Sequence, residues 1–119
     1  MKQCLIVDDS RVIRAVASNI LQSLEFEVCE AEDGVQGLDL CRARMPDVIL
    51  FDMQMPSMTG MEFVRTLRRE PHGARPFVVL STIENDALRL SEVLNAGADE
   101  YVMKPFDRDS LASKLARLR

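Results

Sequence analysis

Five short runs of strand character alternate with five segments of helical periodicity, and this alternation restricts the possible folds more than any other feature. The runs are residues 4–7, 25–31, 48–51, 77–80 and 100–103. A short, continuous apolar run such as 48–51 is typical of a strand buried on both faces of a parallel sheet. Strands that alternate with helices predict a parallel sheet with helices on both faces and right-handed crossovers. We therefore expect a doubly wound α/β fold with five strands and five helices.

The segments between the runs repeat apolar residues at helical spacing. The first helix should be capped by Ser10 or Asp9 and the last by Asp107 or Asp109. Gly97 is well placed to end the fourth helix. The expected inward residues are, helix by helix, Ile13, Val16, Ala17, Ile20, Leu21 and Leu24; Val35, Leu38 and Cys41; Phe63, Val64 and Leu67; Leu90, Val93 and Leu94; and Leu111, Leu115 and Leu118. Arg65, Arg68 and Arg69 are expected to form a solvated basic face.

Length and composition limit the class of protein. A chain of 119 residues with 47% apolar and 29% charged residues fits one globular domain spanning 1–119. The net charge of −4 gives no reason to expect a nucleic-acid or membrane partner. We find no signal peptide and no apolar run near the roughly 20 residues of a membrane helix. Cys4, Cys29 and Cys41 match neither a zinc spacing nor a disulfide framework, so we expect reduced thiols in a cytoplasmic protein, with Cys4 and Cys29 filling core space.

Polar residues follow the predicted strands. The carboxyl ends of parallel strands lie at one edge of a sheet, where open α/β sheets bind ligands. Asp52 by itself could equally cap the turn that Pro56 and Gly60 shape. The joint placement of six residues at this edge favours a site. They are Asp8, Asp9, Asp52, Ser81, Thr82 and Lys104.

These residue types suit phosphoryl chemistry. Three neighbouring carboxylates attract a cation, and an oxygen-only donor set favours Mg²⁺, or Mn²⁺, over zinc. A carboxylate beside such a metal can attack phosphorus and form an acyl phosphate. Lys104 and the metal would neutralise the transferring group, and a hydroxyl of Ser81 or Thr82 could bind a further oxygen.

The chain resembles the receiver domain of bacterial response regulators over essentially its whole length. The resemblance rests on Val7-Asp8-Asp9-Ser10, Asp52-Met-Gln-Met-Pro56 with Gly60, Ser81-Thr82, and Ala96-Gly97-Ala98 followed by Lys104-Pro105-Phe106. It is closest to the short, stand-alone receivers of the chemotaxis type. It implies a flavodoxin-like sheet of order 2-1-3-4-5 and self-catalysed phosphorylation and dephosphorylation, rather than turnover of an outside substrate.

The resemblance also implies a role for each matching residue. Asp52 corresponds to the phosphoacceptor, Asp8 and Asp9 to the metal-binding acids, and Gln54 to the residue whose backbone carbonyl binds the metal. The remaining correspondences are Lys104, which contacts phosphate; Pro105, which follows a cis peptide bond; Ser81, the switch hydroxyl; and Tyr101, the aromatic residue that changes rotamer. The segment from Ser81 to Lys104 is about one residue longer than usual, which leaves open where the helix near Asp86 begins and whether Ile83 or Glu84 overhangs the phosphate.

The implied partners are a histidine kinase or phosphotransfer protein as donor and a target protein. The target would bind the face made by the fourth helix, fifth strand and fifth helix. Two other functions stay possible. A Mg²⁺-dependent phosphatase with an aspartyl nucleophile would want a second acid where Gln54 stands. A flavodoxin-type binding module would want a loop rich in Ser, Thr or Gly where residues 8–11 carry two acids.

Overall fold

Strands and helices alternate along the whole described chain. The computed structural model describes residues 1–83 and 85–118. The elements in chain order are β1 Gln3–Val7, α1 Arg11–Ser23, β2 Glu27–Ala31, α2 Gly34–Ala43, β3 Val48–Asp52, α3 Gly60–Arg69, β4 Phe77–Thr82, α4 Ala87–Asn95, β5 Glu100–Met103, α5 Arg108–Leu115 and the 3₁₀ turn η1 Ala116–Leu118. The predicted series of five strand–helix pairs is confirmed.

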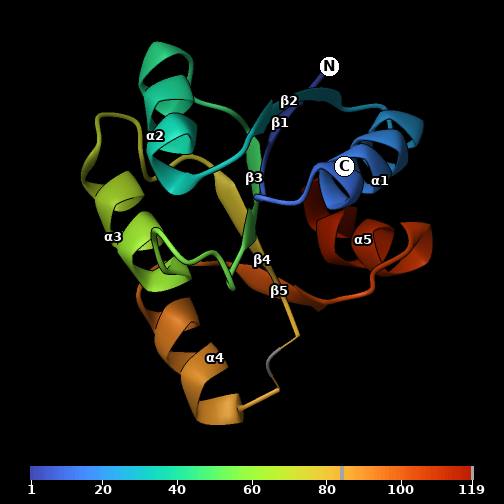
Figure 1. Cartoon of the computed structure of the whole chain (residues 1–119). Helices are drawn as coiled ribbons and strands as arrows, with labels where there is room; N and C mark the ends of the chain where they lie inside the picture. The colour runs from blue at the N-terminus through green and yellow to red at the C-terminus, as the bar shows by residue number, and fades with distance from the viewer. Residues whose placement is uncertain (84, 119) are drawn as a thin grey trace.

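The five strands form one parallel sheet of order β2-β1-β3-β4-β5. The doubly wound, flavodoxin-like fold is therefore confirmed. Helices α1 and α5 cover one face of the sheet, and α2, α3 and α4 cover the other (Figure 1). Strand β3 lies in the middle and is buried along its whole length, as its apolar run predicts.

Successive side chains along each strand point to opposite faces of the sheet, so the core consists of two layers. One layer includes Leu5, Ile49 and Phe63, and Phe63 stacks on Phe51 with ring centroids 4.2 Å apart. The other layer packs against α1 and α5 and contains Ile6, Leu50, Leu21 and Leu111, among others. Because each layer has its own set of covering helices, the sheet is buried on both faces.

Side-chain caps fix the helix starts. Ser10 caps α1 by accepting from the backbone N–H of Ile13 at 3.2 Å, and Asp107 caps α5, which decides between the alternative caps. Helix α4 begins at Ala87 with Asp86 as its cap. Gly97 follows this helix with φ +127°, a conformation that glycine adopts without strain. Glu84 lies outside the described residues.

Three expectations about burial are wrong, and all three depend on what covers a position. Cys29 is exposed because β2 is an edge strand, whereas Cys4 and Cys41 are buried. Burial raises the pKa of the Cys41 thiol to about 11. Val16 and Val35 are 42% and 60% exposed, since none of the described elements covers those sides of α1 and α2.

The basic face expected on α3 is not uniformly solvated. Arg65 and Arg69 are exposed, but Arg68 turns back against the protein. Its guanidinium donates to the backbone carbonyls of Gly97, Gly73 and Pro76 at 2.7–3.0 Å. It also pairs with Asp99 at 3.0 Å. Arg68 therefore joins two loops that the sequence separates.

None of the described helices is long and apolar enough to cross a membrane. The methionines after Asp52 pack the turn against the core: Met55 is buried, and Met53, Met58 and Met61 lie partly buried against the core.

Candidate functional site

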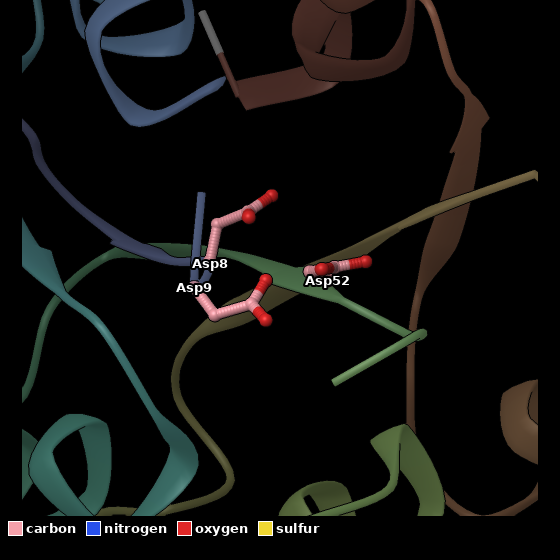
Figure 2. A group of neighbouring side chains, drawn as sticks. All are labelled: Asp8, Asp9 and Asp52. Atoms are coloured by element: carbon pink, nitrogen blue, oxygen red, sulfur yellow. The ribbon is translucent and has the colours of Figure 1, made fainter. Parts of the chain in front are cut away.

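Three carboxylates meet at the carboxyl edge of the sheet (Figure 2). Asp8 and Asp9 directly follow β1, and Asp52 is the last residue of the neighbouring strand β3. Each offers an oxygen atom, and these atoms lie within 4.8 Å of one another. The edge predicted from the strand ends does bring the three acids together.

Backbone geometry fixes the two buried acids. Asp8 is 2% exposed and Asp52 is 3% exposed, whereas Asp9 is exposed. The Asp8 carboxylate accepts from the N–H of Ser10 at 2.8 Å, and that of Asp52 accepts from the N–H of Gln54 at 3.0 Å. Both acids are therefore held at the edge of the core, while Asp9 is open to an incoming ion.

Lys104 reaches this cluster from the end of β5. Its Nζ lies 3.0 Å from Asp8 Oδ2 and 3.1 Å from Asp52 Oδ1. Burial opposes the charge of the ammonium group, but the Asp8 and Asp52 carboxylates outweigh it and raise the pKa of Lys104. The backbone N–H of Lys104 donates to the Thr82 carbonyl at 2.8 Å, and the Lys104–Pro105 peptide bond is cis.

The donor set fits a hard divalent cation. The cluster has three carboxylates but one ammonium group, which contacts only Asp8 and Asp52, so its formal charge is negative. Every side-chain ligand atom that the three acids offer is oxygen. Such ligands suit Mg²⁺ or Mn²⁺. A buried carboxylate with an ammonium group at 3.1 Å can also take a phosphoryl group whose oxygens that ammonium then contacts.

The two hydroxyls on β4 are buried beside the acids. Ser81 pairs with Asp52 across β3 and β4, and the Met53 N–H donates to the Ser81 carbonyl at 2.9 Å. Thr82 accepts from the Gln54 side chain at 2.9 Å. Both residues therefore lie at the carboxyl edge of the sheet, as the sequence predicted from their place at the end of the fourth strand.

The Gln54 side chain has a contact that sequence reasoning missed. Besides donating to Thr82, its carboxamide oxygen accepts from the Ile83 N–H at 3.3 Å. It therefore links the loop after β3 to the loop after β4. No local pattern signals this link, since the partners are 28 and 29 residues apart.

Tyr101 lies on β5, one strand away from the hydroxyls. It pairs with Leu80, and Val102 pairs with Ser81. Its side chain is half-buried, and the Lys114 ammonium lies 5.0 Å from the ring centroid. The residue is thus close to Ser81 in the sheet but at an accessible edge.

The chain is similar to a known family and to several known proteins. Residues 4–116 match the model of the family described as "Response regulator receiver domain". The chemotaxis response regulator CheY4 of Vibrio cholerae has a similar structure, with a TM-score of 0.93 and 34% identity over 100% of this chain and 99% of that one. The chemotaxis protein CheY of Halobacterium salinarum is 32% identical over 97% of this chain and 94% of its own length.

A further solved structure contains the expected ion. The receiver domain of the sensor histidine kinase PA1611 from Pseudomonas aeruginosa holds magnesium in its active-site cleft. It has a TM-score of 0.87 and 29% identity over 98% of this chain and 95% of that one. Other relatives are longer: this chain spans 17% of a sensor kinase/phosphatase and about half of several DNA-binding response regulators.

Proposed function

Because this chain belongs to the response regulator receiver domain family of two-component signalling, we propose that Asp52 is its phosphoacceptor. The family is a regulatory phosphoacceptor domain and not an enzyme of the ordinary kind. The observation that carries the proposal is the contact of buried Asp52 with Lys104, beside Asp8 and Asp9. Gln54, which stands where the aspartyl phosphatase would want a second acid, and the family match favour a receiver over that phosphatase. The two acids within residues 8–11 favour a receiver over the flavodoxin-type module.

In the proposed reaction a carboxylate oxygen of Asp52 attacks the phosphorus of the donor. The new O–P bond forms as the bond to the donor's leaving group breaks, and the leaving group keeps that electron pair. Lys104, already 3.1 Å from Asp52, can contact a phosphoryl oxygen, and the Ser81 hydroxyl can donate to another. Bound Mg²⁺ would neutralise charge on the phosphoryl group, held by Asp8, Asp9, Asp52 and the backbone carbonyl of Gln54.

The proposed donor is a histidine kinase or phosphotransfer protein. Residues 1–119 would form one receiver domain that acts on no outside substrate. The relatives named for chemotaxis make a chemotaxis role reasonable, and that role stays a prediction, as does a cytoplasmic location.

The proposed output is a change of one surface, formed by α4, β5 and α5. When Ser81 binds the phosphoryl group, it vacates space beside Tyr101, which is one residue out of register with it across β4 and β5. Tyr101 then turns inward and reshapes this surface for a target protein. A shift from 1:99 to 99:1 would require about 5.5 kcal/mol of differential stabilisation, which new contacts from Lys104, Ser81 and the metal can supply.

Acetyl phosphate with Mg²⁺ tests the proposed chemistry. The wild-type protein should gain one phosphoryl group that hydroxylamine removes, and EDTA should prevent the gain. Asp52→Asn should abolish it, because the amide is a poor nucleophile. Asp39→Asn is the matched control, since Asp39 is an exposed residue of α2. Mass spectrometry that places the phosphate on Ser10 or Ser81 would contradict the proposal.

A further inference from the structure

Lys114 on α5 contacts two residues of the edge strand β5. These contacts lie outside the proposed phosphoacceptor site. Its Nζ lies 5.0 Å from the centroid of the Tyr101 ring and 3.2 Å from Glu100 Oε1. The same Glu100 oxygen accepts from the Tyr101 backbone N–H at 3.2 Å. A single cation from α5 therefore contacts the side chains of two consecutive β5 residues.

Glu100 limits where the ammonium group can go. A lysine side chain is flexible, and an isolated exposed lysine would spread over many rotamers. Here the ion pair with Glu100 holds Nζ beside the ring. The side chains of Lys114 and Glu100 are each about one-third exposed. The ring also borders a surface hollow of about 370 Å³, together with Met103 and Lys114, so the tyrosine stands at the accessible edge of the sheet.

We propose that Lys114 is a positioning residue that holds Tyr101 in its resting rotamer. The attraction between an ammonium group and an aromatic face exists only while the ring lies beside Lys114. An inward turn of Tyr101 would break this contact, so Lys114 favours the resting state. The inference rests on the proposed switch of Tyr101. At a partly exposed site the contact should change the ratio of the two rotamers about two- to five-fold.

The composition of the chain makes this role measurable. Tyr101 is the only tyrosine, and the chain has no tryptophan. The side-chain χ1 couplings of a single tyrosine, measured by NMR on the unphosphorylated protein, therefore report on this residue alone. Rotamer populations from couplings are preferable to ring shifts, which would respond to the loss of the neighbouring charge by itself.

Lys114→Met removes the cation and keeps the apolar stem. It should raise the inward population of Tyr101 about two- to five-fold without any phosphate. Glu100→Gln should shift the population in the same direction, because it frees the ammonium group. Lys114→Arg should restore the wild-type ratio, since a guanidinium also stacks on aromatic rings. Lys2→Met is the control, because Lys2 precedes β1, which β3 and β4 separate from β5 in the sheet.

An unchanged rotamer ratio in Lys114→Met overturns the role of Lys114. Equal shifts in Lys114→Met and Lys114→Arg overturn it too, because they would indicate packing and not charge. Labelling of Asp52 by acetyl phosphate, measured in the same samples, separates the two ideas. Absent labelling in wild type defeats the proposed function, whereas normal labelling with unchanged couplings defeats only this inference.

Discussion

At the scale of single residues, the three acids of the site differ in what they can do. Asp8 and Asp52 are buried and already engaged by backbone N–H groups and Lys104. Asp9 is exposed. Its carboxylate is thus the acid that can be removed without opening the core.

Asp9→Ala should weaken Mg²⁺ binding by more than about tenfold, because even outer partners of a metal site are worth about that much. Titration calorimetry measures the affinity. Asp39→Ala, an exposed acid on α2, should bind Mg²⁺ like wild type. Asp33→Ala and Asp47→Ala should also keep the affinity, although Asp33 caps α2 and Asp47 binds the Gln3 N–H. Equal affinity in Asp9→Ala and wild type would remove Asp9 from the site.

The three cysteines should react at very different rates. Burial raises the pKa of the Cys4 and Cys41 thiols, to about 11 for Cys41, so little thiolate exists at pH 8 and reagents cannot reach it. Iodoacetamide should alkylate Cys29 first in the native protein and all three in denaturant, as peptide mass mapping would show. Cys29→Ser should lose the fast phase. Labelling of Cys41 as fast as Cys29 would be inconsistent with this structure.

At the scale of elements, Arg68 joins α3 to the ends of two neighbouring connections. Its guanidinium serves carbonyls of the α3–β4 loop, at Gly73 and Pro76, and of the α4–β5 turn, at Gly97. The C-terminal end of α4 is therefore fastened to α3. The α4 helix belongs to the proposed output surface, so this anchor restricts which end of the helix can move.

Arg68→Ala should lower the free energy of unfolding by about 2–3 kcal/mol, because the carbonyls of Gly73, Pro76 and Gly97 would lose their hydrogen bonds to the charged guanidinium. Urea denaturation measures this. Arg65→Ala on the same helix, at an exposed position, should stay within about 0.5 kcal/mol of wild type. Arg68→Lys should recover only part of the loss, since one ammonium cannot reach all the carbonyls. Equal stability of Arg68→Ala and Arg65→Ala would disprove the anchor.

At the scale of the whole molecule, the site and the proposed output surface are linked through the sheet. The acids occupy the carboxyl edge near β1 and β3, whereas Tyr101 lies on the edge strand β5. Strand β4 lies between them and carries Ser81, which pairs with Asp52 on one side and Val102 on the other. A movement of Ser81 would therefore be felt on both sides, by Asp52 in the site and by Val102, the neighbour of Tyr101 on β5.

The phosphate mimic beryllofluoride should change amide chemical shifts beyond the site. We expect changes over residues 92–103 and along α5, because Tyr101 and its neighbours rearrange with Ser81. Ser81→Ala should confine the changes to the loops around Asp52, since this variant lacks the hydroxyl that couples the phosphorylation site to Tyr101. If wild-type changes stop at those loops, another surface carries the output.

Local sequence determined the elements, because the spacing of apolar residues and the cap residues act over a few positions. The local sequence also located the ends of the strands. Because those ends meet at one edge of a parallel sheet, it placed Asp8, Asp9, Asp52 and Lys104 together at that edge. The strand order came from the resemblance to receiver domains, since periodicity does not fix which strands are neighbours.

The tertiary structure decided what covers each position and which distant groups meet. The sequence predicts Cys29 and Val16 in the core, yet β2 is an edge strand and, within the described residues, no element covers that side of α1. Arg68 and Arg65 are alike in sequence, yet one faces carbonyls of two loops and the other faces solvent. The bond of Lys104 to Asp8 spans 96 residues. Such contacts depend on the order of the strands in the sheet, and a pattern of a few residues cannot encode that order.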